Sequence, residues 1–336
     1  MAEIAKKHSA VLSRMLASHL LESGHDAETI FNGSAFDTQL LHEDAPTACL
    51  SDSIKFFEQA AVLTGNANVG FQLGKEQDIR DAGLIGYVGL AAPTVGGFLS
   101  NFTRYSRVVS EALEIDDTHL YTDGIVDWDY AISPGLARRQ YVECSAVCLF
   151  NTLRRFSAGE VIPRSVKFQH NRRSKVDEIE AYFGCKVEFG AERNGFEFAL
   201  SDLELPLTTA DEQLLSVLKS YGDQILLGLG RQTPSVIVEV ERAIARKLTQ
   251  GPATLENVAA SMGMSARTLS RKLAAEGTTF FRLLENLRET MSKSYLRDSN
   301  LMLAEIAFLL GYAGLSSFNE AFKRWTGCSP GQFRTT

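Results

Sequence analysis

The sequence lacks the long apolar runs of membrane proteins. Its most apolar stretches, such as GLIGYVGLAAP after Asp81, are shorter than the ~20 residues that a membrane-spanning helix needs. Near the start, Arg14 and His19 interrupt what would be the apolar part of a signal peptide. With only 8 prolines and no low-complexity segment in 336 residues, the composition is that of a globular protein. We therefore expect no membrane contact and a cytoplasmic location.

Cysteines are few, and their spacing does not indicate disulfides. There are five of them, an odd number that does not fit a disulfide framework. Cys144 and Cys148 lie four residues apart in QYVECSAVCLF, so they would share one face of a helix. They could serve as a redox or metal pair, but the burial habits of free cysteine favour a place in the core.

Motifs for catalysis and metal binding are also missing. The sequence has no Gly-x-Ser-x-Gly, His-Glu-x-x-His, phosphate-binding loop, His-x-x-x-His or Cys-x-x-Cys. Gly83, Gly86 and Gly89 recur every third residue, but the residues between them are apolar, which favours close helix packing over anion binding. The sequence thus predicts no enzyme, no metal site and no cofactor.

Charge is unevenly distributed along the chain, whose formal net charge is −7. Residues 231–336 hold 14 Lys and Arg against 9 Asp and Glu, a net charge of +5, whereas residues 1–230 hold 20 against 32, a net charge of −12. A chain of this length predicts two domains. We place the boundary at GLGRQTPS, between an acidic domain at 1–230 and a basic domain at 231–336 that is suited to phosphate contact.

The basic part contains an internal repeat, with units at 254–277 and 302–327. Both units have an Ala-x-x-x-Gly core, which is Ala259 with Gly263 and Ala307 with Gly311. Each glycine is expected to tolerate a positive φ where one helix turns into the next, and Ser265 is a plausible N-cap for the second helix of the first unit. Each unit is therefore predicted to be a helix-turn-helix.

The second helix of each unit has an apolar side that we predict to be buried. Its residues are Leu269 and Leu273 in the first unit, and Phe318, Phe322 and Trp325 in the second. Between the units, a helix of roughly 18 residues from Thr279 would be roughly 27 Å long. Helices held that far apart would enter successive major-groove turns of B-DNA.

These motifs resemble those of the AraC/XylS family of bacterial transcription regulators. The resemblance is carried by SARTLSRKLAAEG, FFRLLENLR, LAEIAFLLGY and SSFNEAFKRWTGCSPGQFR, in order and at that family's spacing. It implies an all-α DNA-binding domain with two helix-turn-helix units. A looser match within about 51–214 is carried by FFEQAAVLTGNANVGFQLG, AGLIGYVGLAAPTVGGFLSNFTRY and SVKFQHNRRSKVDEIEAYFGCKVEFG. That match implies an AraC-type arabinose-binding and dimerisation-like N-terminal domain.

The outer faces of the second helices are the candidates for DNA contact. The helical period turns Arg267, Ser270 and Arg271 outward, and the family's pattern places base contacts at these positions. On the second unit the outward residues are Ser316, Asn319, Glu320 and Lys323. Because the family often has a basic residue where this chain has Glu320, we expect the first unit to supply most of the affinity.

The N-terminal domain is expected to be α+β, with a small sheet. Helices are predicted at 8–21, 53–64, 138–156 and 176–183, with two more within 81–113. Strands are predicted in GIVDWDYAI, SVKFQH, KVEFG and FEFAL, the first with Val126, Trp128 and Tyr130 on one face.

A set of aromatic residues in this domain has two possible roles. They could line an apolar ligand pocket, or they could simply belong to the core. The set comprises Phe98, Phe102, Tyr105, Trp128 and Tyr130.

Together these features predict a sequence-specific DNA-binding transcription regulator, an activator controlled by a small organic effector in the N-terminal domain. Its expected partners are double-stranded promoter DNA, RNA polymerase and a second copy of the chain in a homodimer. An alternative removes the effector, so that the N-terminal domain only dimerises or contacts RNA polymerase. An enzyme with an attached DNA-binding domain is a third hypothesis, but the sequence has no catalytic constellation to support it.

Overall fold

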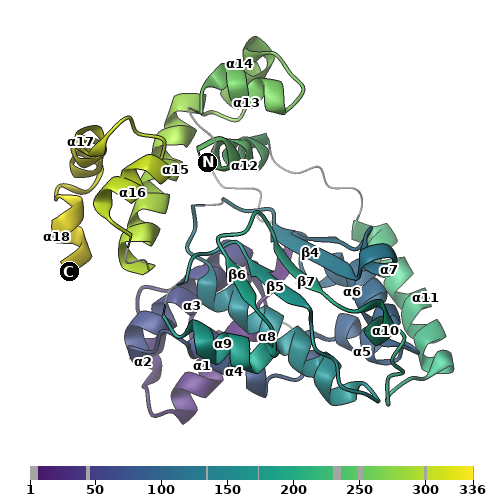
Figure 1. The fold of residues 1–336 in the computed structure, drawn as a ribbon. Helices are drawn as coiled ribbons and strands as arrows, with labels where there is room; N and C mark the ends of the chain where they lie inside the picture. Colours follow the sequence, from purple (N-terminus) through teal and green to yellow (C-terminus); the bar gives the residue numbers. More distant parts are fainter. Residues whose placement is uncertain are drawn as a thin grey trace.

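The computed structural model describes residues 7–42, 46–133, 135–172, 174–229, 236–248, 253–298 and 301–335. Lys7–Leu229, the N-terminal region, forms helices around a small sheet, and Val236–Thr335, the C-terminal region, is all helical (Figure 1). The two regions build separate hydrophobic cores. The predicted fold classes are confirmed, whereas the predicted boundary at residues 230 and 231 lies outside the described residues.

The strands of the N-terminal region form two sheets. β1 (Lys7–Ser9) pairs with β2 (Thr47–Cys49) in a two-stranded antiparallel sheet. The main sheet has the order β3-β4-β7-β5-β6 and is antiparallel except for the parallel pair β5 and β6. Its strands are β3 (Leu113–Asp116), β4 (Ile125–Tyr130), β5 (Ser165–Phe168), β6 (Val187–Phe189) and β7 (Asn194–Glu197).

Helices surround this sheet (Figure 1). They are α1 (Val11–Glu22), α2 (Ala27–Phe31), α3 (Leu50–Thr64), α4 (Val69–Glu76), α5 (Leu84–Leu90), α6 (Val95–Val109), α7 (Leu120–Asp123), α8 (Arg139–Phe156), α9 (Val176–Phe183), α10 (Leu200–Leu203) and α11 (Glu212–Leu229), with 3-10 turns η1 (Thr38–Leu41) and η2 (Ile79–Ala82). The sequence predicted α1, α3, α5, α6, α8 and α9. It did not predict α2, α4, α7, α10 or α11, of which α11 packs on α5 and α6.

Alternating burial in β4 confirms the strand prediction. Val126, Trp128 and Tyr130 are buried on one face, as their period of two requires. The helix predicted at 8–21 is confirmed as α1, but it begins at Val11, because Lys7–Ser9 is the strand β1. His8 is buried there, and its Nε2 lies 2.9 Å from the Tyr141 hydroxyl. Burial lowers the pKa of His8 to about 3.

Small residues in the N-terminal core permit close packing. A Cβ at Gly86 would lie 2.0 Å from the Ile79 carbonyl oxygen, and one at Gly89 would lie 2.7 Å from the Phe98 ring, so these two glycines serve packing as predicted. The prediction was wrong for Gly83, which has a φ of +70° and open space around it, so its role is in the backbone turn before α5. Cys144 and Cys148 are buried on α8, and burial raises the pKa of the Cys148 thiol to about 12. They are core residues. Within the described ranges, no helix combines the length and apolar character needed to cross a bilayer.

The C-terminal region contains two helix-turn-helix units, and each shares core residues with the long helix α15 (Figure 1). The helices in this region are α12 (Val236–Leu248), α13 (Leu255–Ser261), α14 (Ala266–Ala275), α15 (Phe280–Asp298), α16 (Leu303–Leu309), α17 (Leu315–Thr326) and α18 (Pro330–Thr335). One core is formed by α12, α13, α14 and the first half of α15. A second core is formed by α16, α17, α18 and the last turns of α15. The long helix predicted from Thr279 is therefore the scaffold of both units.

Candidate DNA-binding surface

The first helix-turn-helix unit consists of α13 and α14. Gly263 has a φ of +68° at the turn, a conformation that residues with a Cβ rarely adopt. Ser265 caps α14 by accepting a 3.2 Å hydrogen bond from the backbone N–H of Thr268. Leu269 and Leu273 are fully buried. The predicted turn, cap and apolar side are confirmed.

The other side of α14 is positively charged. Arg267, Ser270 and Arg271 are exposed, and Lys272 adds a third cation next to them. No described residue forms an ion pair or hydrogen bond with the guanidinium of Arg267 or Arg271. Both guanidiniums therefore present their full set of donors to solvent, as the recognition of guanine O6 and N7 or of phosphate requires.

The second unit consists of α16 and α17 and repeats the first. Gly311 has a φ of +69° at the turn. Phe318 and Phe322 are fully buried, and Trp325 is half-buried beside the Tyr312 ring, with 6.5 Å between ring centroids. The aromatic side predicted for this helix is thus part of a core and not a base-stacking surface.

The outward face of α17 carries less free positive charge. Ser316, Glu320 and Lys323 are exposed, while Asn319 is half-buried and its Oδ1 has no hydrogen-bond donor among the described residues. The neighbouring Arg324 forms an ion pair with Glu285 of α15. Lys323 and Glu320 nearly cancel on this face, in contrast to α14.

Arg288 of α15 holds the turn of the second unit, a role that the sequence reasoning missed. Its Nε donates to the Leu310 carbonyl oxygen at 2.8 Å, and Nη2 donates to that of Gly311 at 3.2 Å. The guanidinium also lies 4.5 Å from the centroid of the Tyr312 ring. Burial lowers the pKa of Arg288. The available signal was its position four residues after Leu284, on the apolar side of the predicted helix.

The aromatic residues proposed to line a ligand pocket lie in the packed core. Phe98, Tyr105, Trp128 and Tyr130 are buried, and Phe102 is partly buried and stacks on Phe98. None of the five lines the pocket described below. Their role as ligand contacts stays a prediction.

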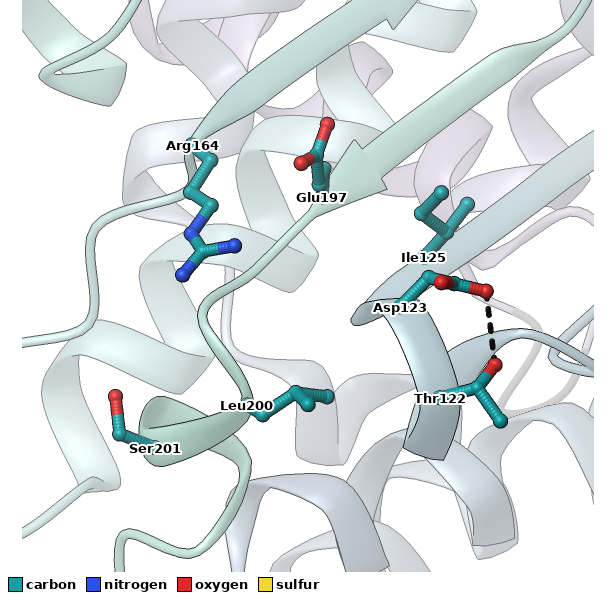
Figure 2. A pocket seen from close by; sticks show the side chains of 7 residues that line it. All are labelled: Thr122, Asp123, Ile125, Arg164, Glu197, Leu200 and Ser201. Carbon is teal, nitrogen blue, oxygen red and sulfur yellow. Dashed lines mark hydrogen bonds between the residues drawn. The ribbon is translucent and has the colours of Figure 1, made fainter.

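A pocket of 490 Å³ opens at one end of the main sheet (Figure 2). It is lined by Thr122, Asp123, Ile125, Arg164, Glu197, Leu200 and Ser201. Arg164 extends into the open space from the chain just before β5, and no described residue pairs with its guanidinium.

Both carboxylates of this pocket accept hydrogen bonds from neighbouring side chains. Asp123 accepts a 2.8 Å hydrogen bond from Thr122 and lies 3.0 Å from Nδ1 of His119, and these bonds lower its pKa. Glu197 accepts from Ser165 at 3.0 Å. The pocket therefore offers one unpaired cation and two anchored carboxylate side chains. Within the described ranges, no three His, Cys, Asp or Glu side chains gather in a way that would hold a metal ion.

An α+β region joined to two helix-turn-helix units defines a DNA-binding transcription regulator. Residues 24–207 match the model of the arabinose-binding domain of AraC transcription regulators, and residues 258–336 match that of a helix-turn-helix domain. The first match alone covers more than half of the chain. The chain belongs to the AraC family of transcription regulators.

The chain is similar to bacterial regulators along most of its length. The HTH-type transcriptional regulator VirS of Mycobacterium tuberculosis is 27% identical over 295 residues, which cover 87% of this chain and 86% of VirS. The ornithine utilization regulator of Pseudomonas aeruginosa is 26% identical over 317 residues, which cover 93% and 92% of the two chains. The solved structure of the transcriptional regulator CdpR from Pseudomonas aeruginosa aligns with a TM-score of 0.43 at 24% identity, over 97% of this chain and 98% of that one.

Proposed function

We propose that the chain is a promoter-binding activator that acts in the cytoplasm as a homodimer and contacts RNA polymerase. Residues 231–336 would bind DNA, and residues 1–230 would dimerise and bind a small effector. The observation that carries the proposal is the amphipathic character of α14. Its apolar side is buried through Leu269 and Leu273, so the unpaired Arg267 and Arg271 on the other side face solvent.

In this proposal each unit reads one segment of the major groove. Arg267, Ser270 and Arg271 contact base edges through α14, and Ser316, Asn319, Glu320 and Lys323 do so through α17. The 19 residues of α15 span about 28 Å at ~1.5 Å each, which brings the second helices to successive turns of the groove on one face of the duplex.

The pocket at the end of the sheet supports an amino acid as the class of effector. Arg164 suits a ligand carboxylate, while Glu197 and Asp123 suit an ammonium group. The similarity to a regulator named for ornithine utilization favours the same class. A thermal-shift screen of amino acids, with the corresponding amines and deaminated acids as controls, tests this. A ligand at 100 times its Kd adds about 2.7 kcal/mol to the stability of the domain that binds it.

One observation favours the effector-free alternative, in which the N-terminal domain only dimerises or contacts RNA polymerase. Four of the five aromatic residues expected to line an apolar site are buried in the hydrophobic cores of the N-terminal region, and the fifth packs against one of those cores, so packing accounts for their positions without a ligand. If no compound in the screen shifts the melting temperature, and the protein still activates transcription from its promoter in a purified system, the alternative replaces the effector proposal.

DNA recognition is tested separately. Sequencing of genomic fragments retained by the purified full-length protein identifies an operator, and fluorescence anisotropy at fixed salt then measures the Kd of wild type and of Arg271→Ala. We expect one enriched motif and a loss of affinity in the variant. Retention of fragments without any shared motif would contradict sequence-specific binding.

A further inference from the structure

An arginine of the C-terminal region lies against two carboxylates of the N-terminal region. Arg242 is on α12, and its Nη1 donates to Glu114 Oε2 of β3 at 2.7 Å. Its Nη2 lies 3.5 Å from Asp129 Oδ2 of β4. Glu114 and Asp129 are directly paired across the two antiparallel strands, so their side chains lie on the same face of the sheet. The side chains of Arg242 and Asp129 are 17% and 18% exposed, whereas that of Glu114 is 38% exposed, so the guanidinium is largely withdrawn from water and one of its two carboxylate partners is not.

A second contact lies close to the first in the structure. A Cβ at Gly135 would come within 3.0 Å of Leu287 Cδ1 and within 3.0 Å of Thr290 Cβ, both on α15. Asp129 is the penultimate residue of β4, and Gly135 lies six residues after it in the chain. Leu287 shares the core of the first unit with Ala243 and Ile244, which lie one and two residues after Arg242 on α12. The two contacts therefore belong to one docking surface between the N-terminal region and the base of the first unit.

We propose that this docking surface, formed by Glu114, Asp129 and Gly135 on one side and Arg242, Leu287 and Thr290 on the other, fixes the orientation of the first helix-turn-helix unit. In a dimer held together by the N-terminal regions, that orientation sets the half-site spacing that the protein accepts. The inference rests on the proposed function, that of a dimeric DNA-binding regulator. Arg242 is a positioning residue, because DNA contact is assigned to α14, whose Arg267 and Arg271 stay exposed while the surface is docked.

The chemistry of the cluster suits a contact that opens and closes. Nε of Arg242 is buried without a hydrogen-bond acceptor among the described residues, so the docked guanidinium is only partly satisfied. Asp129 also lies 3.9 Å from Nη1 of the buried Arg138, within its own region. When Arg242 leaves, Asp129 keeps this second cation and is not left as an unpaired charge. Undocking therefore costs less than breaking a two-member buried pair.

The same strand connects the docking surface to the proposed effector pocket. Ile125 begins β4 and lines the pocket, and Asp129 lies four residues further along the strand. At ~3.3 Å per residue the two positions are about 13 Å apart. A ligand that shifts β4 at one end thus acts on the partner of Arg242 at the other.

The test uses full-length protein and synthetic operators built from the motif that it selects. One set carries the two half-sites at their natural spacing, and another carries them displaced by ~5 base pairs, which turns one half-site to the opposite face of the duplex. Arg242→Glu removes the ion cluster. Gly135→Phe places a large side chain against α15 and so separates this helix from the N-terminal region without any change of charge. Lys247→Glu is the matched control, because it makes the same charge change on α12 and Lys247 has no partner among the described residues.

We expect wild type and Lys247→Glu to prefer the natural spacing by roughly tenfold or more, since a rigid dimer cannot engage both displaced half-sites. Arg242→Glu and Gly135→Phe should both lower that preference to about threefold or less. For a single half-site, the Kd of Arg242→Glu should equal that of Lys247→Glu, and the Kd of Gly135→Phe should equal that of wild type. Adding Glu114→Arg to Arg242→Glu should recover part of the preference. Small-angle scattering of the free proteins should show a larger radius of gyration in the two undocked variants.

Four results distinguish failure of the inference from failure of the proposed function. If wild type discriminates spacing and both variants do so equally well, the docking surface does not set orientation. If wild type binds a single half-site but shows no spacing preference, the dimer geometry on which the inference rests is absent. If wild type selects no DNA motif at all, the proposed function itself fails. An unchanged radius of gyration in both variants would reject the docked contact, whatever the DNA measurements show.

Discussion

The two helix-turn-helix units share one backbone design and differ on the faces turned outward. Both turn at a glycine with positive φ, and both bury two large apolar residues of the second helix. On α14 the outward side has the free cations Arg267 and Arg271, whereas on α17 Glu320 stands beside Lys323. The repeated pattern thus specifies a fold twice, and the residues outside that pattern give each copy its own electrostatic character.

The units also differ in what supports them. The first is aliphatic, includes α12 in its core and lies against the N-terminal region through Arg242. The second unit has an aromatic core and is stabilised by hydrogen bonds from arginine side chains to backbone carbonyl oxygens. Arg288 donates to Leu310 and Gly311, and Arg334 donates to Leu301 at 2.7 Å. We therefore expect the orientation of the first unit to depend on the N-terminal region, and that of the second to depend on α15 and α18.

The largest difference should come from the cores. Phe322→Ala removes a fully buried ring that lies 5.8 Å from that of Phe318 and 5.4 Å from that of Phe333. We expect a loss of about 3 to 5 kcal/mol in the second unit, from burial and the residual cavity. Hydrogen exchange should then speed up in α16 and α17 and remain slow in α13 and α14.

Leu273→Ala in the first unit is the counterpart, with an expected loss of about 2 to 5 kcal/mol and the opposite pattern of exchange. Equal acceleration in both units for either variant would mean that the two cores unfold as one.

A smaller effect is expected from removing the hydrogen bonds of Arg288 in the second unit. Arg288→Met keeps much of the apolar stem but removes both hydrogen bonds to the end of α16 and the contact with the Tyr312 ring. We expect a loss of about 2 to 3 kcal/mol in the second unit, because charged hydrogen bonds to buried carbonyls are lost. Urea unfolding followed by Trp325 fluorescence measures it. Arg282→Met, an exposed arginine near the start of the same helix, serves as control and should leave the midpoint nearly unchanged.

The sequence predicted these units well because each depends on local signals. Glycine at a turn, Ser265 at a helix start and apolar residues at helical spacing act within about ten residues of each other, and all were confirmed. The strand β4 was equally readable from its alternation. Local chemistry of this kind needs no knowledge of distant contacts.

Other features depend on contacts between distant parts of the chain and were not predictable in this way. His8 and Ser9 were expected to begin a helix, but they belong to β1, which pairs with Thr47–Cys49 at separations of 38 to 42 residues along the chain. Arg242 looks like a solvated charge on an amphipathic helix until its partners on β3 and β4 are placed. Arg288 falls on the apolar side of its helix, but the sequence does not indicate that it binds the carbonyl oxygens of Leu310 and Gly311. The aromatic residues could not be divided between core and pocket, because apolar side chains serve both.

The comparison of outward faces is sharpened by Arg271→Ala. Loss of a bidentate contact to guanine is worth roughly 1 to 3 kcal/mol, so the Kd for the operator should rise by about 5- to 150-fold. Anisotropy titrations at several salt concentrations measure the change, and Lys323→Ala on α17 is the matched variant. We expect the smaller loss for Lys323→Ala, since the nearby Glu320 already offsets its charge. Equal losses would show that the two units share the affinity evenly.

The smallest effect is expected at the residue that sets α17 apart. Glu320→Gln keeps the size of the side chain and its accepting oxygen but removes the charge that repels phosphate. We expect non-specific DNA to bind more tightly by less than about 1 kcal/mol, while discrimination at one base pair of the operator declines, because the carboxylate is the better acceptor for cytosine N4. Titration of the operator and of its single-base variants measures both changes. If non-specific affinity stays constant and no position of the operator loses discrimination, Glu320 does not face the DNA, and the difference between the two units lies in their cores and supports alone.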